Sequence, residues 1–259
     1  MDTVALHHKL EGKGPKIALL HPVGLDLTFF APMAAALAKD FCVLSVDLRG
    51  HGRSPMKPAP RGLADYVDDV HALFEVLSFA PAAVAGFSFG GMIAQMLAAT
   101  YPRDVSALIP CATPGTLPPE GRPVARDRAD QAERGGMQAV LEATLDRWFT
   151  PAFRQRSGDA AARERLLSDD PAAWAAAWRA ISGLDALPHL RSVRVPALCI
   201  AGELDRSSPP PAVKAIADAI PGARFTVLHG APHMLFVEQP EAAARVIRDF
   251  LTELPALSA

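Results

Sequence analysis

Three residues that lie far apart in the chain have the side-chain types of a nucleophile, a base and an acid. Ser88 lies in VAGFSFGGMIAQ, residues 84–95, Asp205 lies in CIAGELDRSSPP, and His233 lies in LHGAPHMLFVEQP. A serine hydroxyl is a weak nucleophile at neutral pH, and it attacks a carbonyl group when a histidine held by a carboxylate takes its proton. The three side chains therefore predict nucleophilic acyl transfer.

Ser88 is the central residue of a G-x-S-x-G pattern, with Gly86 and Gly90 on either side. An apolar run precedes it and an amphipathic segment follows it, so the serine is predicted at a sharp turn from a strand into a helix. A Cβ atom at either glycine would collide with the neighbouring element in such a turn. The helix behind Ser88 would direct its free N–H groups at an anion formed on the substrate.

The order of the three residues along the chain agrees with this turn, because serine, acid and histidine follow one another in that order in folds built around it. Asp205 and His233 each come directly after an apolar run predicted as a buried strand. Parallel strands bring their carboxyl ends to one edge of a sheet, where ligands bind. We therefore expect both side chains at the edge of the sheet where the turn of Ser88 lies.

Glu203 and His229 are the nearest alternatives to the acid and the base, but both lie closer to the ends of the predicted strands. His229 and His233 also have the four-residue spacing of helical metal ligands. Gly230 and Pro232 between them prevent a helix, so no metal site is expected. No cofactor is expected either, since the chemistry needs only side chains, backbone amides and water.

Backbone N–H groups must stabilise the oxyanion that forms during acyl transfer. One donor is expected to be Phe89, the residue after the nucleophile. The other should come from the loop HPVGLD, where Pro22 has no N–H and Val23 is the next residue. Gly24 would let this loop approach closely. An ordinary Pro-Gly turn is the alternative interpretation of the same residues.

Six short apolar runs, separated by amphipathic segments, define the elements that must position these residues. Continuous apolar runs are typical of strands buried on both faces of a parallel sheet, and helices between them imply crossover connections. The predicted fold is therefore α/β, with a mostly parallel, doubly wound sheet. The runs are KIALLH (16–21), FCVLSVD (41–47), AAVAGFS (82–88), VSALIPC (105–111), PALCIAG (196–202) and RFTVLHG (224–230).

The segment from 116 to 190 interrupts this alternation. It is rich in Ala, Arg and Trp, and residues 136–149 and 171–181 have the spacing of amphipathic helices. The stretch LPPEGRP, residues 117–123, is interpreted as a hinge or linker. An inserted helical cap over one end of the sheet is expected. The predicted domain bounds are 1–115 with 191–259 for the core and 116–190 for the cap.

Composition excludes several other classes of function. The chain has 259 residues, of which 50% are hydrophobic, and a net charge of −2 with acids and bases mixed. No basic stripe suits nucleic acid, and no apolar stretch is long enough for a membrane span. Cys42, Cys111 and Cys199 are interpreted as buried thiols in a reducing compartment, and the N-terminus lacks a signal pattern, so a cytoplasmic protein is expected. The oligomeric state is left open, with a homo-oligomer as one option.

The segments LLHPVG, VLSVDLRGHGRS, VAGFSFGGMIAQ, IAGELD and GAPHMLFVEQPE resemble, in this order, the α/β-hydrolase superfamily. The resemblance implies the α/β-hydrolase fold and Ser88, Asp205 and His233 as the catalytic triad. Within DLRGHGRS, the residues Arg49, His51 and Arg53 are expected to fix the loop. Two positions depart from the family pattern. His21-Pro22 stands where His-Gly is usual, and Pro232 replaces the glycine before the catalytic histidine.

Two segments of the expected cap, GGMQAVLEATLDRWFTPAF (135–153) and DPAAWAAAWRAISGLD (170–185), look like those of 3-oxoadipate enol-lactonases and their esterase-like relatives. This likeness implies hydrolysis of a small lactone or ester. Arginine pairs well with a substrate carboxylate, although cap arginines can instead be solvated or paired with acids. Aromatic residues at helical spacing can likewise belong to the core. The candidate pocket residues are Phe29, Trp148, Phe149 and Trp178, with Arg147 or Arg179 for a carboxylate.

Two alternative functions remain open at this point. A hydrolase of C–C bonds in ring-cleavage products, or a perhydrolase, would use the same triad with a different cap. A binding protein that kept the fold without catalysis is the alternative from another class. The intact set of serine, acid and histidine favours an enzyme.

Overall fold

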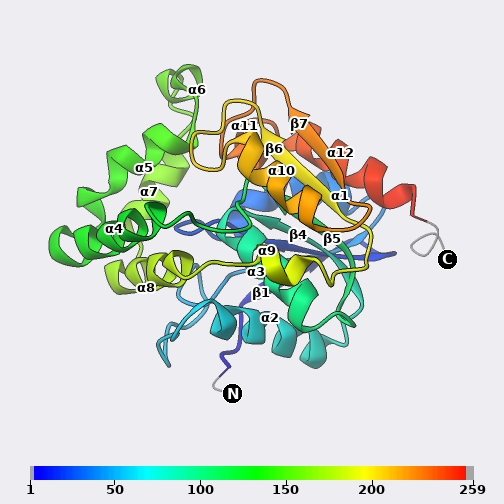
Figure 1. Cartoon of the computed structure of the whole chain (residues 1–259). Coiled ribbons are helices and arrows are strands. Elements are labelled where there is room, and N and C mark those ends of the chain that lie inside the picture. The colour runs from blue at the N-terminus through cyan, green and yellow to red at the C-terminus, as the bar shows by residue number, and fades with distance from the viewer. Residues whose placement is uncertain (1–2, 255–259) are drawn as a thin grey trace.

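The computed structural model describes residues 3–254, which form a seven-stranded sheet with helices packed on both faces (Figure 1). The strand order is β1-β3-β2-β4-β5-β6-β7, in which β1 runs antiparallel to β3 and all other pairs are parallel. The α/β prediction is therefore confirmed. The strands are β1 His8–Glu11, β2 Lys16–Leu20, β3 Cys42–Val46, β4 Ala82–Phe87, β5 Val105–Cys111, β6 Leu198–Gly202 and β7 Arg224–Leu228.

Strands β2 to β6 match five of the six predicted runs and are almost completely buried, as continuous hydrophobicity predicts. The sixth run forms β7, but this strand lies at the sheet edge, and Val227 is 39% exposed. Burial on both faces was therefore the wrong expectation for β7. Strand β1 was not predicted, because its sequence HKLE is short and polar.

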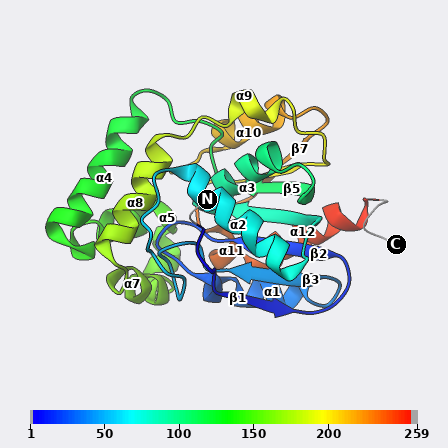
Figure 2. The ribbon, with the colours of Figure 1, turned by 90° about the horizontal axis from the view of Figure 1, so that it is seen from below.

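The helices that pack on the sheet, which include α9 at the end of the expected cap segment, form two groups on its two faces (Figure 2). Helix α1 contacts α12, whereas α2 contacts α3, and α9 contacts both α3 and α10. These helices cover the apolar faces of the parallel strands, which explains why the strands are buried. Their bounds are η1 Leu27–Phe30, α1 Ala31–Leu37, α2 Leu63–Leu77, α3 Phe89–Thr100, α9 Leu187–Leu190, α10 Pro210–Ala219, α11 Leu235–Glu238 and α12 Pro240–Thr252.

Between β5 and β6, the helices α4 to α8 stand together on one side of the molecule, whereas α9 lies with the core helices α3 and α10 (Figures 1 and 2). We call residues 116–190 the cap, and its domain bounds stay a proposal. Within the cap, the main packing contact is that between α4 and α8. The cap helices are α4 Gly121–Gly135, η2 Met137–Ala139, α5 Leu141–Trp148, α6 Pro151–Gln155, α7 Ala160–Leu167 and α8 Pro171–Ser182.

Two expectations for the cap are corrected. Residues 117–123 are not wholly a linker, because α4 begins at Gly121. The buried face of α4 consists of alanines, such as Ala125, Ala129 and Ala132, which bury little apolar surface and gave no strong pattern. The helix expected over 136–149 is also divided, since η2 ends before Val140 and α5 starts after it.

The cap is joined to the core by a close contact and by hydrogen bonds. The Trp174 ring lies so close to Gly24 that a Cβ atom there would approach its Cζ3 to 2.5 Å. Thr150 donates its amide and its hydroxyl to the Glu238 carboxylate, at 2.7 and 2.9 Å. The Met234 amide donates to the Trp148 carbonyl at 3.0 Å. The last bond links the cap directly to the residue after His233.

The loop that follows β3 is held by Arg49, one of the three residues expected to fix it. The buried Arg49 guanidinium donates to both oxygens of Asp69 on α2, each at 2.6 Å, and to the Pro58 carbonyl. Two parallel bonds between a guanidinium and a carboxylate fix both groups in orientation as well as position. Arg49 is therefore a loop-fixing residue. Among residues 3–254, no helix combines the length and the apolar character that crossing a membrane requires.

Candidate active site

Ser88 occupies the turn from β4 into α3 in a backbone conformation that few residues other than glycine adopt, with φ 50° and ψ −112°. The turn is tight because strand and helix touch. A Cβ atom at Gly86 would lie 2.2 Å from the Gly90 carbonyl oxygen, and one at Gly90 would lie 2.1 Å from the Leu20 carbonyl oxygen. Both glycines are thus required by close approach, as the G-x-S-x-G pattern predicted.

His233 joins Ser88 to Asp205 by two hydrogen bonds. Its Nε2 lies 3.0 Å from the Ser88 Oγ, and its Nδ1 lies 2.8 Å from the Asp205 Oδ2. A carboxylate oxygen accepts, so Nδ1 carries the proton, and Nε2 is left to accept from the serine hydroxyl. The other Asp205 oxygen accepts the amides of Ser207 and Ser208, at 2.7 and 2.8 Å. This arrangement allows the imidazole to take a proton from Ser88.

Glu203 and His229 form a separate pair at the surface. His229 Nδ1 lies 2.7 Å from a Glu203 oxygen, and the Gly230 amide donates to the same oxygen at 2.8 Å. The His229 side chain is 94% exposed, whereas that of His233 is 3% exposed. The structure therefore brings His233 and Asp205, and not their two alternatives, to the serine.

The loop after β2 lies beside the serine turn, where the oxyanion donors were expected. The Gly90 amide donates to the His21 carbonyl at 3.1 Å, and Val23 lines the cavity that Ser88 opens into. Within residues 3–254, neither the Val23 amide nor the Phe89 amide donates a hydrogen bond. Both N–H groups are thus free to bind an oxyanion, Val23 from the loop and Phe89 from the first turn of α3.

The His21 side chain orients this loop. Its Nε2 accepts the Leu48 amide at 2.9 Å, so its Nδ1 carries the proton that is donated to the Pro22 carbonyl at 2.7 Å. Burial lowers the pKa of His21 to about 4, which keeps the imidazole neutral at pH 7. The carbonyl and the following N–H of one trans peptide point in opposite directions. Holding the Pro22 carbonyl therefore also orients the Val23 N–H.

A cavity of about 470 Å³ lies between the cap and the core. Ser88, Val23 and His233 line it from the core. The cap side is lined largely by apolar side chains, among them Trp148 of α5 and Trp178 of α8. A volume of this size fits a small organic molecule, and apolar walls with few polar groups are typical of ligand sites. The candidate nucleophile and base are thus open to a small-molecule substrate.

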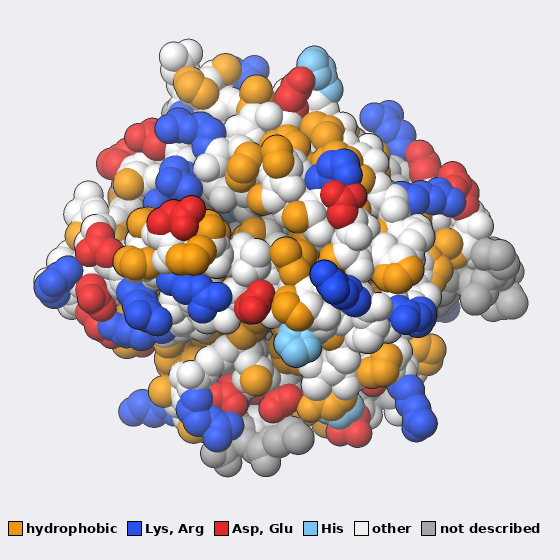
Figure 3. Space-filling view, in the orientation of Figure 1, with side chains coloured by type: hydrophobic (Ala, Val, Ile, Leu, Met, Phe, Trp, Pro, Cys, Tyr) orange, Lys and Arg blue, Asp and Glu red, His pale blue; other side chains and the backbone are white. Residues whose placement is uncertain are grey.

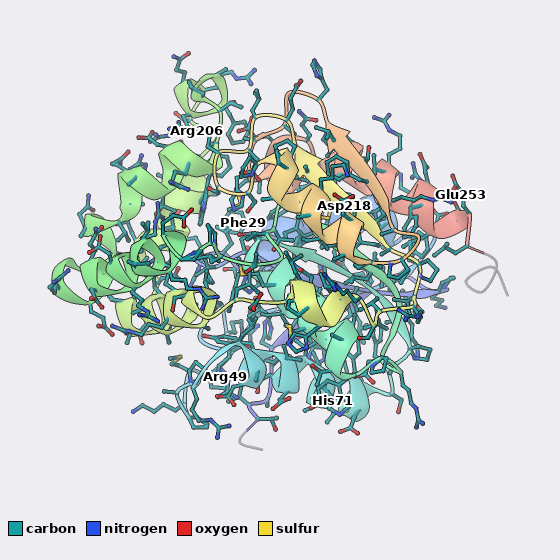
Figure 4. The ribbon with its side chains drawn as sticks, in the orientation of Figure 1. Phe29, Arg49, His71, Arg206, Asp218 and Glu253 are labelled. Atoms are coloured by element: carbon teal, nitrogen blue, oxygen red, sulfur yellow. The ribbon has the colours of Figure 1, made fainter. Side chains whose placement is uncertain are left out.

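Of the pocket residues predicted from sequence, Trp148, Trp178 and Arg147 line this cavity, but Phe29, Phe149 and Arg179 do not. Phe29 packs against the hydrophobic core from η1 (Figure 4). Phe149 is buried and stacks on Phe153. Arg179 points to the surface of the cap, where Glu133 and Asp130 accept its hydrogen bonds. Its partners come from α4, a helix that was not predicted.

Arg128 is a cavity residue that sequence reasoning missed. It lies on α4 with its guanidinium over the Trp178 ring, 4.9 Å from the ring centroid. The segment ARDRADQAER around it mixes arginines with several acids, and nothing in this pattern distinguishes Arg128 from its neighbours. Only the position of α4 against α8 directs this side chain towards the cavity. Over the described part of the chain, residues 3–254, no three His, Cys, Asp or Glu side chains are grouped to hold a metal ion.

The cap and most of the core match a family of known proteins. The model of the alpha/beta hydrolase family matches residues 17–246, which span both the serine turn and the loop of His233. The chain is 33% identical over 250 residues to a pimeloyl-[acyl-carrier protein] methyl ester esterase of Chromobacterium violaceum, with 93% of this chain and 95% of the esterase covered.

Two further relatives are enol-lactonases. The chain is 28% identical to 3-oxoadipate enol-lactonase 2 of Acinetobacter baylyi, with 92% of this chain and 90% of the relative covered. The crystal structure of the enol-lactonase from Burkholderia xenovorans LB400 superposes with a TM-score of 0.91 at 34% identity, with 96% of this chain and 97% of that chain covered. The likeness thus includes the cap as well as the sheet.

Proposed function

Because the chain belongs to the alpha/beta hydrolase family, we propose that it is a serine hydrolase that cleaves a small carboxylic ester or lactone. The observation that carries this proposal is the continuous hydrogen-bonded set of Ser88, His233 and Asp205 at the edge of the cavity. A nucleophile within reach of a base, which a carboxylate orients in turn, is the arrangement that acyl transfer requires.

In the first half of the proposed reaction, Ser88 Oγ attacks the carbonyl carbon of the substrate while His233 Nε2 takes the hydroxyl proton. Asp205 holds the imidazole in the required tautomer and stabilises its positive charge. The negative charge that develops on the carbonyl oxygen is bound by the N–H groups of Val23 and Phe89. The imidazolium then returns its proton to the leaving oxygen, and an acyl-enzyme remains on Ser88.

In the second half, a water molecule gives its proton to His233 and attacks the acyl-enzyme. The same two amides bind the second oxyanion, and the proton returns to Ser88 as the carboxylic acid departs. A lactone follows the same path, but its leaving oxygen stays attached to the acyl chain, so one product forms. No step requires a cofactor.

The relatives support ester chemistry and leave two kinds of substrate to compare. One relative is named as a methyl ester esterase and another as an enol-lactonase. The volume and the apolar lining of the cavity favour a compact acyl group. We infer a small ester or lactone similar to that of the 3-oxoadipate enol-lactonases, because the likeness to a solved enol-lactonase covers the cap, which shapes the cavity.

The expected partner is a small molecule, rather than nucleic acid or a lipid surface. Basic and acidic side chains are interspersed on the face seen in Figure 3, without a continuous field of one sign. The free state of Cys42, Cys111 and Cys199 agrees with the reducing environment of the cytoplasm, where we infer that the protein acts.

Hydrolysis of p-nitrophenyl acetate and of a panel of methyl esters and lactones tests the proposal. The wild type should turn over at least some of the panel, and Ser88→Ala should lower kcat/KM by about a thousandfold or more. His229→Gln is the matched control, because it changes an exposed histidine near the same strand end and should leave turnover unchanged. If the wild type and Ser88→Ala are equally inactive on the whole panel, the chain is not a hydrolase of this class.

A further inference from the structure

The backbone that carries the His233 imidazole is held on its C-terminal side through the next residue. Pro232 has no N–H group, and within residues 3–254 the His233 amide donates no hydrogen bond. The Met234 amide donates to the Trp148 carbonyl at 3.0 Å, and the Met234 carbonyl accepts the Glu238 amide at 3.1 Å. The peptide groups that follow the imidazole are therefore held by the end of α5 on one side and by the single turn α11 on the other.

Glu238 is the last residue of α11, and its side chain reaches back to the cap. One carboxylate oxygen accepts the Thr150 amide at 2.7 Å, and the other accepts the Thr150 hydroxyl at 2.9 Å. Within residues 3–254 this carboxylate forms no ion pair, and both of its hydrogen bonds come from Thr150. Hydrogen bonds to an ionised group are shorter and stronger than neutral ones, and two of them fix orientation as well as distance.

These contacts hold the junction between α5 and α6 at both of its ends. Trp148 is the last residue of α5, and its carbonyl is one of those that find no partner inside their own helix. Thr150 is the N-cap of α6, where its hydroxyl also accepts the Phe153 amide at 3.2 Å. One bond alone would let the junction rotate about it. The Glu238 carboxylate supplies the second point of attachment, and it does so four residues after Met234.

We propose that Glu238 and Thr150 are a positioning pair for the His233 imidazole. By fastening the peptide after the ring to the cap, they keep Nε2 in line with the Ser88 hydroxyl. This inference rests on the proposed function, in which the imidazole takes the serine proton. The bond to Asp205 fixes one end of the ring, and the backbone that carries the ring must fix the other. A displacement of about 1 Å at a reacting group costs about a hundredfold in rate, so a small shift of this backbone affects turnover.

Steady-state hydrolysis of p-nitrophenyl acetate tests the pair. Glu238→Ala should lower kcat about tenfold or more and change KM by less than about threefold, because proton transfer depends on the alignment of the ring and binding of a small ester does not. A pair that merely supports the cavity wall would raise KM instead, since Trp148 lines the cavity. A larger change in KM than in kcat, or wild-type kinetics in a folded Glu238→Ala protein, overturns the positioning role.

Glu241→Ala is the matched control, because Glu241 is an exposed acid in the first turn of α12 without a hydrogen bond or ion pair among the described residues. It should keep kcat within about twofold. Thermal unfolding checks that each variant folds. If Glu238→Ala does not fold, Glu238→Gln takes its place, since it keeps the size and one acceptor oxygen, and we expect a loss of about threefold in kcat.

Variants of Thr150 show whether the two residues act together. Thr150→Val removes the hydroxyl and should lower kcat less than Glu238→Ala does, because the amide still donates. Thr150→Ser restores the hydroxyl and should retain most of the wild-type kcat. Combining Glu238→Ala with Thr150→Val should be no slower than Glu238→Ala alone, since both changes remove the same hydrogen bond. Losses that multiply in the double variant would contradict a pair.

Exchange of one imidazole proton with water measures the alignment without turnover. The Nδ1 proton of His233 lies between side chains that are 3% and 0% exposed, so it exchanges when the ring separates from Asp205. Proton NMR, with His233→Gln to identify the signal, should show exchange about tenfold faster in Glu238→Ala and unchanged in Glu241→Ala. If exchange follows this pattern but the wild type hydrolyses no ester, the positioning pair stands and the hydrolase proposal fails. Ester hydrolysis by the wild type, together with equal exchange in all three proteins, overturns the pair and leaves the hydrolase proposal intact.

Discussion

His21 and His51 pack edge to face, with ring centroids 5.2 Å apart, and both imidazoles are almost completely buried. Burial lowers the pKa of His21 to about 4 and that of His51 to about 3, and the neighbouring His21 also lowers the pKa of His51. Both rings are therefore neutral in the folded protein at pH 7, although they lie next to the loop that supplies the Val23 amide.

The first prediction concerns stability in acid. Because the folded pKa values lie below the unfolded value of about 6.5, the unfolded chain binds more protons as pH falls below 6.5. Each histidine should thus lower the free energy of unfolding by about 2 kcal/mol between pH 7 and pH 5. Urea unfolding at the two pH values measures this change.

His51→Gln provides the comparison for that measurement, since glutamine can donate a hydrogen bond but does not titrate. The variant should lose about 2 kcal/mol less than the wild type over the same pH interval. Asp169 acts in the opposite direction, because burial raises its pKa to about 7, but it contributes equally to both proteins and cancels. Equal acid sensitivity of the two proteins would contradict the neutral state of His51.

The second prediction concerns the orientation of the Val23 amide. His21→Phe removes the shorter of the two hydrogen bonds to the Pro22 carbonyl and leaves the 3.4 Å bond from the Leu25 amide, so the peptide that carries the Val23 N–H is held less firmly. We expect kcat to fall about tenfold to a hundredfold with little change in KM, because the amide acts mainly on the oxyanion. Steady-state kinetics on a neutral ester measures both constants, and thermal unfolding checks folding. A larger change in KM than in kcat would contradict this positioning role.

The third prediction tests the close approach behind Ser88. Gly90→Ala places a Cβ atom 2.1 Å from the Leu20 carbonyl oxygen, and backbone atoms cannot move away as a flexible side chain can. We expect a loss of about 3 kcal/mol or more in the free energy of unfolding, or failure to fold. Gly62→Ala is the control, because nothing lies within 4 Å of a Cβ atom there. Both are measured by urea unfolding.

The fourth prediction separates the two acidic residues near the end of β6. Asp205→Asn should lower kcat by about a hundredfold to ten-thousandfold, because an amide in place of the carboxylate no longer stabilises the imidazolium of His233. Glu203→Gln changes an acid two residues away that contacts the exposed His229, and it should leave kcat within about twofold. Similar losses in both variants would contradict the assignment of the acid.

Much of the core could be predicted from sequence, because its signals are local. Strands β2 to β6 are continuous apolar runs, and the turn at Ser88 needs glycines at two fixed distances along the chain. Strand β1 has no such signal, because its residues are mostly polar. It is a strand because it pairs with β3, and this long-range pairing cannot be predicted from its own sequence. Helix α4 was missed for a similar reason, because alanines form its buried face.

The cavity was predicted less well than the candidate triad, because its lining depends on contacts between helices. Arg179 and Arg128 are both cap arginines in Ala-rich segments, and their sequences do not distinguish them. The packing of α4 against α8 places Glu133 beside one of them and Trp178 beside the other. Which arginine is neutralised and which faces the cavity follows from this crossing.

The hydrogen bond from the Met234 amide to the Trp148 carbonyl connects the loop that carries His233 to the cap. The His233 ring is held by a carboxylate of the core, while the next peptide is held by the end of a cap helix. Any displacement of the cap would thus pull on the peptide that follows the imidazole. The position of the cap and the alignment of the base are therefore mechanically connected through this peptide.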